Sequence, residues 1–235
     1  MLFLHGIGGH RYHWASQLDF FSSRYKAAAW DARGYGDSDD YTDALRFSDF
    51  VDDVLRVLDF FGEERAHLVG LSMGGRIARE AALRHPERLL SLTLANTSPG
   101  FDALSPEQVR RFAEERQNRT PESMRTLLGS RADPGAYEAL VKAFQALRKP
   151  SYLKTLEASV AQDRAAPLER IRVPTLVITG TEDPVYPEPI AQNMAGRIPG
   201  AKLVALEGCG HLSNLEQPER FNRVLMEFLN KENER

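Results

Sequence analysis

The chain has 235 residues, of which 42% are hydrophobic and 27% are charged, and its formal net charge is -3. These values are ordinary for a globular protein, so they argue against a disordered or fibrous chain, and the length suits a single α/β domain. Because the sequence has no obviously basic face, we expect no nucleic-acid partner and no acidic membrane surface, and a small-molecule substrate instead.

The cysteine content and the N-terminus bear on the cellular compartment. The single cysteine, Cys209, excludes an intramolecular disulfide and favours a reducing, cytoplasmic location. No apolar run approaches the ~18 residues that a membrane-spanning helix needs. Met1 leads into the apolar residues 2–4 without a basic segment, so we expect no signal peptide, although so short a start also fits a truncated chain that has lost a leader.

The predicted elements alternate between short apolar strands and amphipathic helices. The first half of the chain has predicted strands at residues 2–4, 25–30, 66–71 and 89–95, and helices at 47–61 and 73–84. The second half has predicted strands at residues 173–179 and 202–206, and helices at about 189–198 and 218–230. Because such alternation needs crossover connections, we predict an α/β fold with a mostly parallel sheet flanked by helices.

Residues 101–167 interrupt this alternation. The segment is rich in Ala, Arg, Glu and Leu and has no β-branched run, which predicts several helices inserted between two strands. An ordinary helical excursion would have the same composition, but ligands of open α/β sheets bind at the carboxyl ends of the strands. We therefore predict a helical cap over a site, inserted between the core segments 1–100 and 168–235.

A strand-to-helix turn carries the strongest chemical signal. The segment Gly70-Leu71-Ser72-Met73-Gly74 fits the pattern Gly-x-Ser-x-Gly, and the required apolar strand precedes it while a helix follows. A turn this sharp strains the serine backbone, and the two glycines leave room where a Cβ atom would clash. The helix N-terminus behind the serine favours a developing oxyanion. We therefore predict Ser72 as a nucleophile rather than an incidental serine.

A serine hydroxyl needs an adjacent base, and His211 is the best candidate among six histidines. It lies between the last strand and the last helix, on a loop that can reach the carboxyl ends of the strands. The other five histidines are expected to have different roles. His5 should brace the glycine-rich loop, and His10 and His13 are expected to line the pocket. His67 should lie in the core or at an edge, and His85 at the end of a helix. Asp183, after the fifth strand, is predicted to orient the imidazole, with Glu182 and Asp163 as alternatives. The chain order Ser72, Asp183, His211 is the order expected for this class.

Two backbone N–H groups should face the oxyanion. Met73, directly after the nucleophile, is predicted to supply one, and Ile7, in the glycine-rich loop after the first strand, the other. The segment Asp31-Ala32-Arg33-Gly34-Tyr35-Gly36-Asp37-Ser38 is rich in reactive side chains, but we interpret it as a braced loop. Cys209 has no base of its own, so we interpret it as a packing residue.

These segments together resemble the α/β-hydrolase family over nearly the whole chain. The resemblance is carried by five segments, His5–Gly9, Asp31–Ser38, Gly70–Gly75, Thr179–Pro184 and Gly210-His211. The segments Leu71–Gly75 and His211–Pro218 are most similar to the 3-oxoadipate enol-lactonase-like branch of serine esterases. The family usually has two further strands before the point where this chain begins. We expect them to be absent here, which would make the 25–30 strand a sheet edge available for oligomer formation.

The sequence thus predicts a hydrolase that cleaves a carboxylic ester or lactone through an acyl-enzyme on Ser72, with no cofactor and no metal. His211 would act as the base and then protonate the leaving alkoxide. Seven arginines in the predicted cap are candidates for binding a substrate carboxylate: Arg110, Arg111, Arg116, Arg119, Arg125, Arg131 and Arg148. Two alternatives stay open: C–C cleavage or perhydrolysis by the same residues, and a non-catalytic binding protein on this fold.

Overall fold

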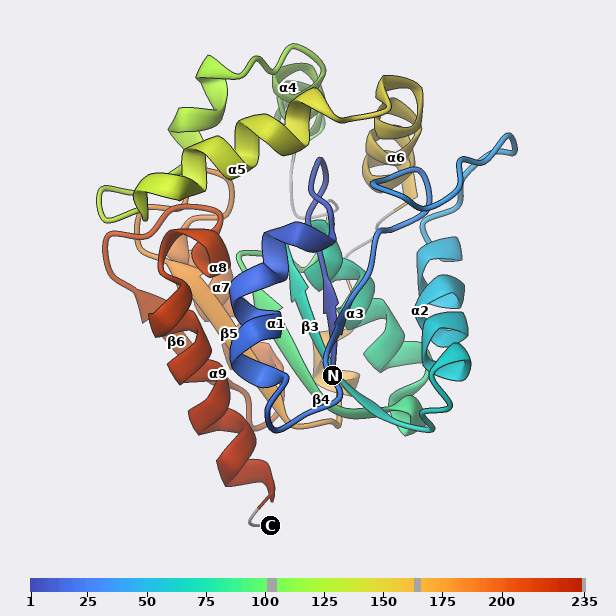
Figure 1. Ribbon diagram of the computed structural model, residues 1–235, viewed down its shortest axis with the longest axis vertical. Helices are drawn as coiled ribbons and strands as arrows, with labels where there is room; N and C mark the ends of the chain where they lie inside the picture. Colours follow the sequence, from blue (N-terminus) through green and yellow to red (C-terminus); the bar gives the residue numbers. More distant parts are fainter. Residues whose placement is uncertain (101–104, 163–165, 234–235) are drawn as a thin grey trace.

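A central parallel sheet organises the computed structural model, which describes residues 1–100, 105–162 and 166–233 (Figure 1). Its six strands are all parallel and follow the order β2-β1-β3-β4-β5-β6. Their bounds are β1 (Leu2–Leu4), β2 (Ala28–Ala29), β3 (Ala66–Leu71), β4 (Leu89–Ala95), β5 (Thr175–Gly180) and β6 (Lys202–Leu206). The predicted α/β-hydrolase fold with a mostly parallel sheet is therefore confirmed.

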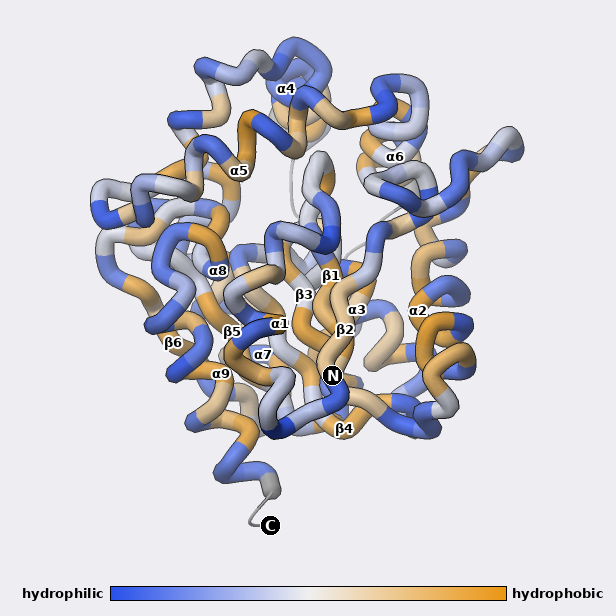
Figure 2. Tube along the Cα trace, viewed as in Figure 1, coloured by the Kyte–Doolittle hydropathy of each residue, from blue (hydrophilic) through white to orange (hydrophobic). Residues whose placement is uncertain are grey.

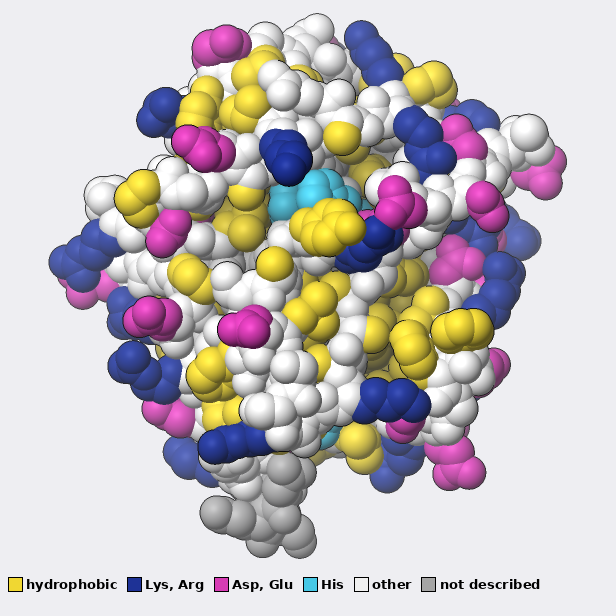
Figure 3. Space-filling view, in the orientation of Figure 1, with side chains coloured by type: hydrophobic (Ala, Val, Ile, Leu, Met, Phe, Trp, Pro, Cys, Tyr) yellow, Lys and Arg dark blue, Asp and Glu magenta, His cyan; other side chains and the backbone are white. Residues whose placement is uncertain are grey.

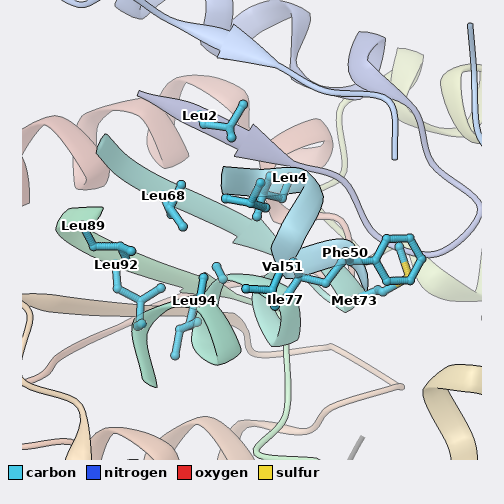
Figure 4. Packing of buried hydrophobic residues seen from close by; sticks show 14 of the residues in the cluster. Leu2, Leu4, Phe50, Val51, Leu68, Met73, Ile77, Leu89, Leu92 and Leu94 are labelled. Atoms are coloured by element: carbon cyan, nitrogen blue, oxygen red, sulfur yellow. The ribbon is translucent and has the colours of Figure 1, made fainter. Parts of the chain in front are cut away.

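The interior strands are continuous apolar runs because helices cover both faces of the sheet. All six residues of β3 are buried, and the alternating residues of β1 reach two separate hydrophobic clusters. Leu2 and Leu4 pack in the cluster beneath α2 (Asp49–Phe60) and α3 (Met73–Arg84), as Figure 4 shows. Phe3 packs in the other cluster, with α1 (Ala15–Phe21) and α9 (Pro218–Asn233).

The helices turn their apolar sides toward the sheet. In Figure 2 the inner side of α2 is hydrophobic and its outer side is hydrophilic, which matches the periodicity on which the helix was predicted. The helix α7 (Glu188–Arg197) packs on the same face of the sheet as α3, through Met194. The short helices α1 and α8 (Ser213–Glu216) were not predicted, because so few residues do not establish a helical period.

The strand β2 is shorter than predicted. The apolar run at residues 25–30 suggested a full strand, but only Ala28 and Ala29 pair, opposite Leu2 and Phe3. β2 lies at the edge of the sheet and β1 has three residues, so the rest of the run has no strand beside it. The predicted edge position is therefore observed, whereas oligomer formation through it stays a prediction.

The helices of the predicted cap lie together over the carboxyl ends of the strands (Figure 1). They are α4 (Pro106–Gln117), the 3-10 helix Glu122–Leu127, α5 (Pro134–Gln145) and α6 (Lys149–Gln162). The limits 101–167 stay a prediction, and the alternative acid Asp163 lies outside the described residues. Among the described helices none is both long and apolar enough to cross a membrane, and the cytoplasmic location stays a prediction.

Candidate active site

The turn that holds Ser72 is a strained connection between β3 and α3. Ser72 has φ 54° and ψ -114°, in a region that side-chain-bearing residues rarely adopt and that costs about 1–3 kcal/mol. Both flanking glycines are sterically required: a Cβ on Gly70 would lie 2.2 Å from the Gly74 carbonyl oxygen, and one on Gly74 would lie 2.1 Å from the Leu4 carbonyl oxygen. Thr97 holds the turn by donating its hydroxyl hydrogen to the Ser72 carbonyl at 2.6 Å.

The structure brings the three predicted residues Ser72, His211 and Asp183 into one hydrogen-bonded chain. The Nε2 atom of His211 lies 3.0 Å from Ser72 Oγ, and its Nδ1 atom lies 3.1 and 3.0 Å from the two carboxylate oxygens of Asp183. All three side chains are buried. Because a carboxylate only accepts, Nδ1 of a neutral imidazole carries the hydrogen and Nε2 is free to accept the serine hydroxyl hydrogen.

Asp183 is held ionised by its surroundings. Its Oδ1 accepts the backbone N–H groups of Val185 at 2.8 Å and Tyr186 at 3.0 Å, and its Oδ2 accepts the Asn96 amide at 3.0 Å. Burial raises the pKa of this carboxyl, but the electrostatic interaction with His211 and the hydrogen bonds from His211 and Asn96 outweigh burial, so the pKa lies below its usual value. A carboxylate that stays ionised can keep the imidazole in one tautomer.

Asn96 is a residue of this site that the sequence reasoning missed. It follows β4 directly, in a left-handed conformation with φ 45°. Its amide nitrogen donates to Asp183 and also to the Gly210 carbonyl at 2.9 Å, while its oxygen accepts the Ser213 hydroxyl at 2.5 Å. Asn96 thus joins the loop of the acid to the loop of the base. Its position at the carboxyl end of a buried strand was the only signal available.

Glu216 is the second missed residue, and it fixes the His211 loop from the other side. Its side chain is buried, with only 1% of the residue exposed, and accepts three backbone N–H groups. Oε2 accepts from Gly129 at 2.7 Å and from Gly210 at 2.8 Å, and Oε1 accepts from Leu212 at 2.8 Å. Since Gly129 belongs to the cap, this carboxylate ties the cap to the base loop. The sequence pattern alone did not distinguish it from an exposed acid.

The predicted oxyanion donors, Ile7 and Met73, lie on the two loops that flank the serine. The Ile7 loop lies against the nucleophile, because a Cβ on Gly6 would lie only 3.2 Å from Ser72 Cβ. Met73 is the first residue of α3, and the first N–H groups of a helix have no partner within it. Within the described part of the chain, neither N–H group is hydrogen-bonded to another residue. The arrangement fits the predicted oxyanion hole, which stays a prediction.

His5 braces the loop that carries Ile7. Its Nδ1–H donates to the Gly6 carbonyl at 2.8 Å, and its Nε2 accepts the Ala32 N–H at 3.0 Å. Burial lowers the pKa of His5 to about 4, so the ring is neutral and can make both bonds at once. His13 lines the cavity beside Ser72, and Figure 3 shows histidine side chains at the opening between the cap and the core.

Three histidines remain. His10, in the first loop, accepts the Tyr12 N–H at 3.1 Å and does not line the cavity at Ser72. His67 and His85 lie apart from the three predicted residues. His67 is buried in β3, where its Nδ1 contacts the Ser91 hydroxyl at 2.8 Å. His85 caps the end of α3 and lies 3.5 Å from the Glu87 carboxylate. Neither lines the cavity at Ser72.

The competing residues have structural partners of their own. The exposed Glu182 accepts the Ser130 backbone N–H at 2.6 Å and its hydroxyl at 2.7 Å, rather than contacting His211. In the segment 31–38, Asp31 pairs with Arg11, and the Arg33 Nε lies 2.5 Å from the Asp53 carboxylate. These pairs brace that loop, in agreement with its interpretation as structural.

Cys209 is fully buried and stands two residues before His211 in the same loop. Burial raises the pKa of the thiol well above its ordinary value, so the reactive thiolate is not populated at neutral pH. Its interpretation as a packing residue agrees with this burial.

A small cavity between the core and the cap contains Ser72 and His211. Its volume is ≈ 40 Å³, room for about one water molecule. Its floor comes from the core loops, and its roof is an apolar surface of the cap with two arginines, the roof residues being Arg116, Arg119, Met124, Leu127, Leu140, Phe144 and Tyr152. A larger groove of ≈ 580 Å³ between β2 and α2 is lined by none of the three predicted residues.

Comparison with known proteins places this geometry in a family. A profile of the alpha/beta hydrolase fold family matches residues 1–218. The 3-oxoadipate enol-lactonase 2 of Acinetobacter baylyi is 29% identical over 232 residues, which cover 96% of this chain and 86% of that protein. The 2-hydroxy-6-oxononadienedioate/2-hydroxy-6-oxononatrienedioate hydrolase of Paraburkholderia phymatum is 31% identical over 252 residues, covering 97% of this chain and 86% of the relative.

A solved structure agrees with these sequence relatives. The crystal structure of the enol-lactonase from Burkholderia xenovorans LB400 superposes with a TM-score of 0.87 at 27% identity, over 97% of this chain and 90% of that one. The chain belongs to the α/β-hydrolase fold family. The names of its relatives are those of hydrolases, which supports hydrolase activity on a small molecule and the predicted resemblance to enol-lactonases.

Proposed function

We propose that this chain is a serine hydrolase that cleaves a carboxylic ester or lactone through an acyl-enzyme on Ser72. The observation that carries the proposal is the buried chain of contacts at 3.0 Å from Ser72 Oγ to His211 and from His211 to Asp183. A strained serine at a helix N-terminus, beside an imidazole oriented by a carboxylate, is the arrangement that activates a hydroxyl for acyl transfer.

The proposed reaction needs only groups that this chain supplies, and water. His211 Nε2 takes the hydroxyl proton as Ser72 Oγ attacks the carbonyl carbon, and Asp183 stabilises the imidazolium that forms. The N–H groups of Ile7 and Met73 would bind the oxyanion. His211 then protonates the leaving alkoxide, and a water molecule deprotonated by the same nitrogen releases the acyl group.

The test is hydrolysis of 4-nitrophenyl esters of graded acyl length by the wild type and Ser72→Ala. We expect the variant to lose about 10⁴-fold or more in kcat, because removal of such a nucleophile abolishes the acyl-enzyme route. Ser98→Ala is the matched control, since Ser98 is also a buried serine but its hydroxyl has no partner among the described residues. Turnover unchanged in Ser72→Ala would refute the proposal.

A second reaction is compatible with the same three residues. The Paraburkholderia phymatum relative carries the name of a dienedioate hydrolase, which supports C–C cleavage as the alternative. Perhydrolysis would also use the same serine and histidine. A parallel assay of the ester panel and of ring-cleavage dienoates distinguishes these reactions, because a C–C hydrolase would favour the dienoates in kcat/KM. If no substrate of either kind is turned over, a binding protein on this fold becomes the better explanation.

A further inference from the structure

A short segment of the predicted cap, residues 127–131, lies along the loop of His211, backbone against backbone. The Leu127 carbonyl accepts the His211 backbone N–H at 2.7 Å, and the Arg131 N–H donates to the Gly208 carbonyl at 2.9 Å. The segment connects the 3-10 helix of the cap with α5. The cap is therefore hydrogen-bonded directly to the backbone of the predicted base.

Glycines make this contact possible, because the two backbones lie too close together for side chains between them. A Cβ on Gly129 would lie 2.4 Å from the Gly208 carbonyl oxygen, and one on Gly210 would lie 2.3 Å from the Leu127 carbonyl oxygen. Backbone atoms cannot turn aside as the end of a flexible side chain can, so either methyl group would push the two segments apart. The contact therefore requires glycine on both sides.

The same segment also contacts the loop of the predicted acid. Ser130 donates its backbone N–H at 2.6 Å and its hydroxyl hydrogen at 2.7 Å to the carboxylate of Glu182, the residue directly before Asp183. Glu182 is exposed, so water competes for these bonds and they hold the segment only weakly. The firm attachment of the 127–131 segment is therefore the buried one, to the loop of His211.

Leu127 joins this backbone contact to the cavity. Its side chain lines the cavity that contains Ser72 and His211, while its carbonyl accepts the His211 N–H. Because the cavity has a volume of only ≈ 40 Å³, an acyl group attached to Ser72 would lie against its lining side chains. Leu140 lines the same cavity and is equally buried, at 5% exposure, but it lies inside α5, whose own hydrogen bonds use its backbone groups.

We propose that Leu127 is a positioning residue that couples occupation of the cavity to the placement of the His211 base. An acyl group that packs against its side chain holds the 127–131 segment against the base loop, and the Leu127 carbonyl then holds His211 beside Ser72 Oγ. This inference rests on the proposed function. It adds that an ester whose acyl group leaves the space at Leu127 empty is turned over more slowly, and is not merely bound more weakly.

The first test removes the Leu127 side chain and measures kcat for 4-nitrophenyl acetate and 4-nitrophenyl hexanoate. We expect Leu127→Ala to lower kcat for the acetate about 10- to 100-fold, because misplacing a reacting group by about 1 Å has an effect of this size. The hexanoyl chain should fill the space that the leucine leaves and restore most of the lost kcat. The ratio of the hexanoate kcat to the acetate kcat should therefore rise about 10-fold or more over the wild-type ratio.

Leu140→Ala is the matched control, because it removes the same kind of side chain from the same cavity. Among the described residues, no hydrogen bond joins Leu140 to the base loop. We expect this variant to change KM for the hexanoate and to keep the ratio of the two kcat values near that of the wild type. If both variants change the ratio equally, or if Leu127→Ala leaves it unchanged, the proposal is overturned.

The second test separates the two backbones without changing the lining of the cavity. Gly129 does not line the cavity, so Gly129→Ala would act through the clash of its Cβ with the Gly208 carbonyl. We expect kcat to fall about 10-fold or more for every ester of the panel while KM changes little. Wild-type kcat in Gly129→Ala would contradict the proposal.

Gly196→Ala is the control for this variant, since a Cβ on Gly196 of α7 would meet no atom within 4 Å. It should keep the wild-type kcat. If Gly129→Ala fails to fold, the comparison of Leu127→Ala with Leu140→Ala decides the question.

Amide hydrogen exchange separates this inference from the proposed function, because it needs no turnover. In a Ser72→Ala background, we expect Gly129→Ala to speed exchange of the His211 backbone N–H about 10-fold or more, since the Leu127 carbonyl no longer accepts it, while amides of β4 keep their rates. Unchanged exchange at His211, with 4-nitrophenyl esters still hydrolysed by the wild type, would refute the coupling alone. Faster exchange without hydrolysis of any ester by the wild type would instead refute the proposed function.

Discussion

The two sides of the cavity at Ser72 are built in different ways. The core side is made of backbone and short side chains, held by close approach and hydrogen bonds: Gly70 and Gly74 leave no space for a Cβ, and Asn96 joins two loops. The cap side is made of longer side chains, both apolar ones and the two arginines Arg116 and Arg119. A change on the core side should therefore affect the reaction itself, whereas a change in the cap outside the 127–131 segment should affect which substrate is accepted.

The largest effect expected on the core side comes from Asp183→Asn. The amide would offer a donor where His211 Nδ1–H now donates, so the imidazole would adopt the wrong tautomer. We expect kcat for 4-nitrophenyl butyrate to fall by about 10⁴-fold while KM changes little. The measurement is steady-state hydrolysis of this ester by the variant and by the wild type under the same conditions.

Glu182→Gln is the control for this prediction, because Glu182 is the neighbouring acid and an alternative orienter. It is exposed and accepts from Ser130, so its loss should leave kcat near the wild-type value. An inactive Glu182→Gln beside an active Asp183→Asn would reverse the assignment of the acid.

A smaller effect is expected where the two sides of the cavity are joined. Glu216→Gln would replace one acceptor oxygen with a donor that faces backbone N–H groups of Gly129, Gly210 and Leu212. We expect the free energy of unfolding to fall by about 1–3 kcal/mol and kcat to fall as the His211 loop loses its position. Urea denaturation and kcat are the two measurements.

Glu207→Gln is the matched control for the Glu216 variant. Glu207 lies just before the same loop but is exposed, where it pairs with Arg131. Its substitution should change the free energy of unfolding by no more than about 0.5 kcal/mol. Equal stability and kcat for Glu216→Gln and the wild type would show that the buried carboxylate does not position the base loop.

The central strands of the fold could be predicted from the sequence, because a strand that is buried on both faces consists of mostly apolar residues. The strands Ala66–Leu71 and Leu89–Ala95 and the helix Met73–Arg84 have the predicted bounds. The strand 173–179 begins two residues late, at Thr175, because Pro174 has no N–H to give to a ladder. The predicted length of the edge strand 25–30 was wrong, because the extent of an edge strand depends on how much of the neighbouring strand lies beside it.

The residues of the site could be predicted only where a local sequence pattern indicates them. Ser72 stands in a motif whose spacing fixes a turn, and His211 and Asp183 follow strands, so their convergence could be predicted. Asn96 and Glu216 act through contacts with residues far along the chain, which no local pattern records. Arg116 differs from the exposed Arg111 in burial alone, and burial in a helical cap depends on packing against the core.

The smallest predicted effect tests the brace of the core-side loop through its pH dependence. Burial lowers the pKa of His5 to about 4 in the folded state, against about 6.5 in an unfolded chain. The unfolded state therefore binds more protons between these values, and stability is lost as the pH falls from 6.5 toward 4. One such histidine contributes at most about 1.4 kcal/mol per pH unit to this slope. In urea denaturation between pH 6.5 and 5, we expect the free energy of unfolding of His5→Asn to fall less steeply with pH than that of the wild type. Equal slopes in the two proteins would mean that His5 is not a buried neutral brace.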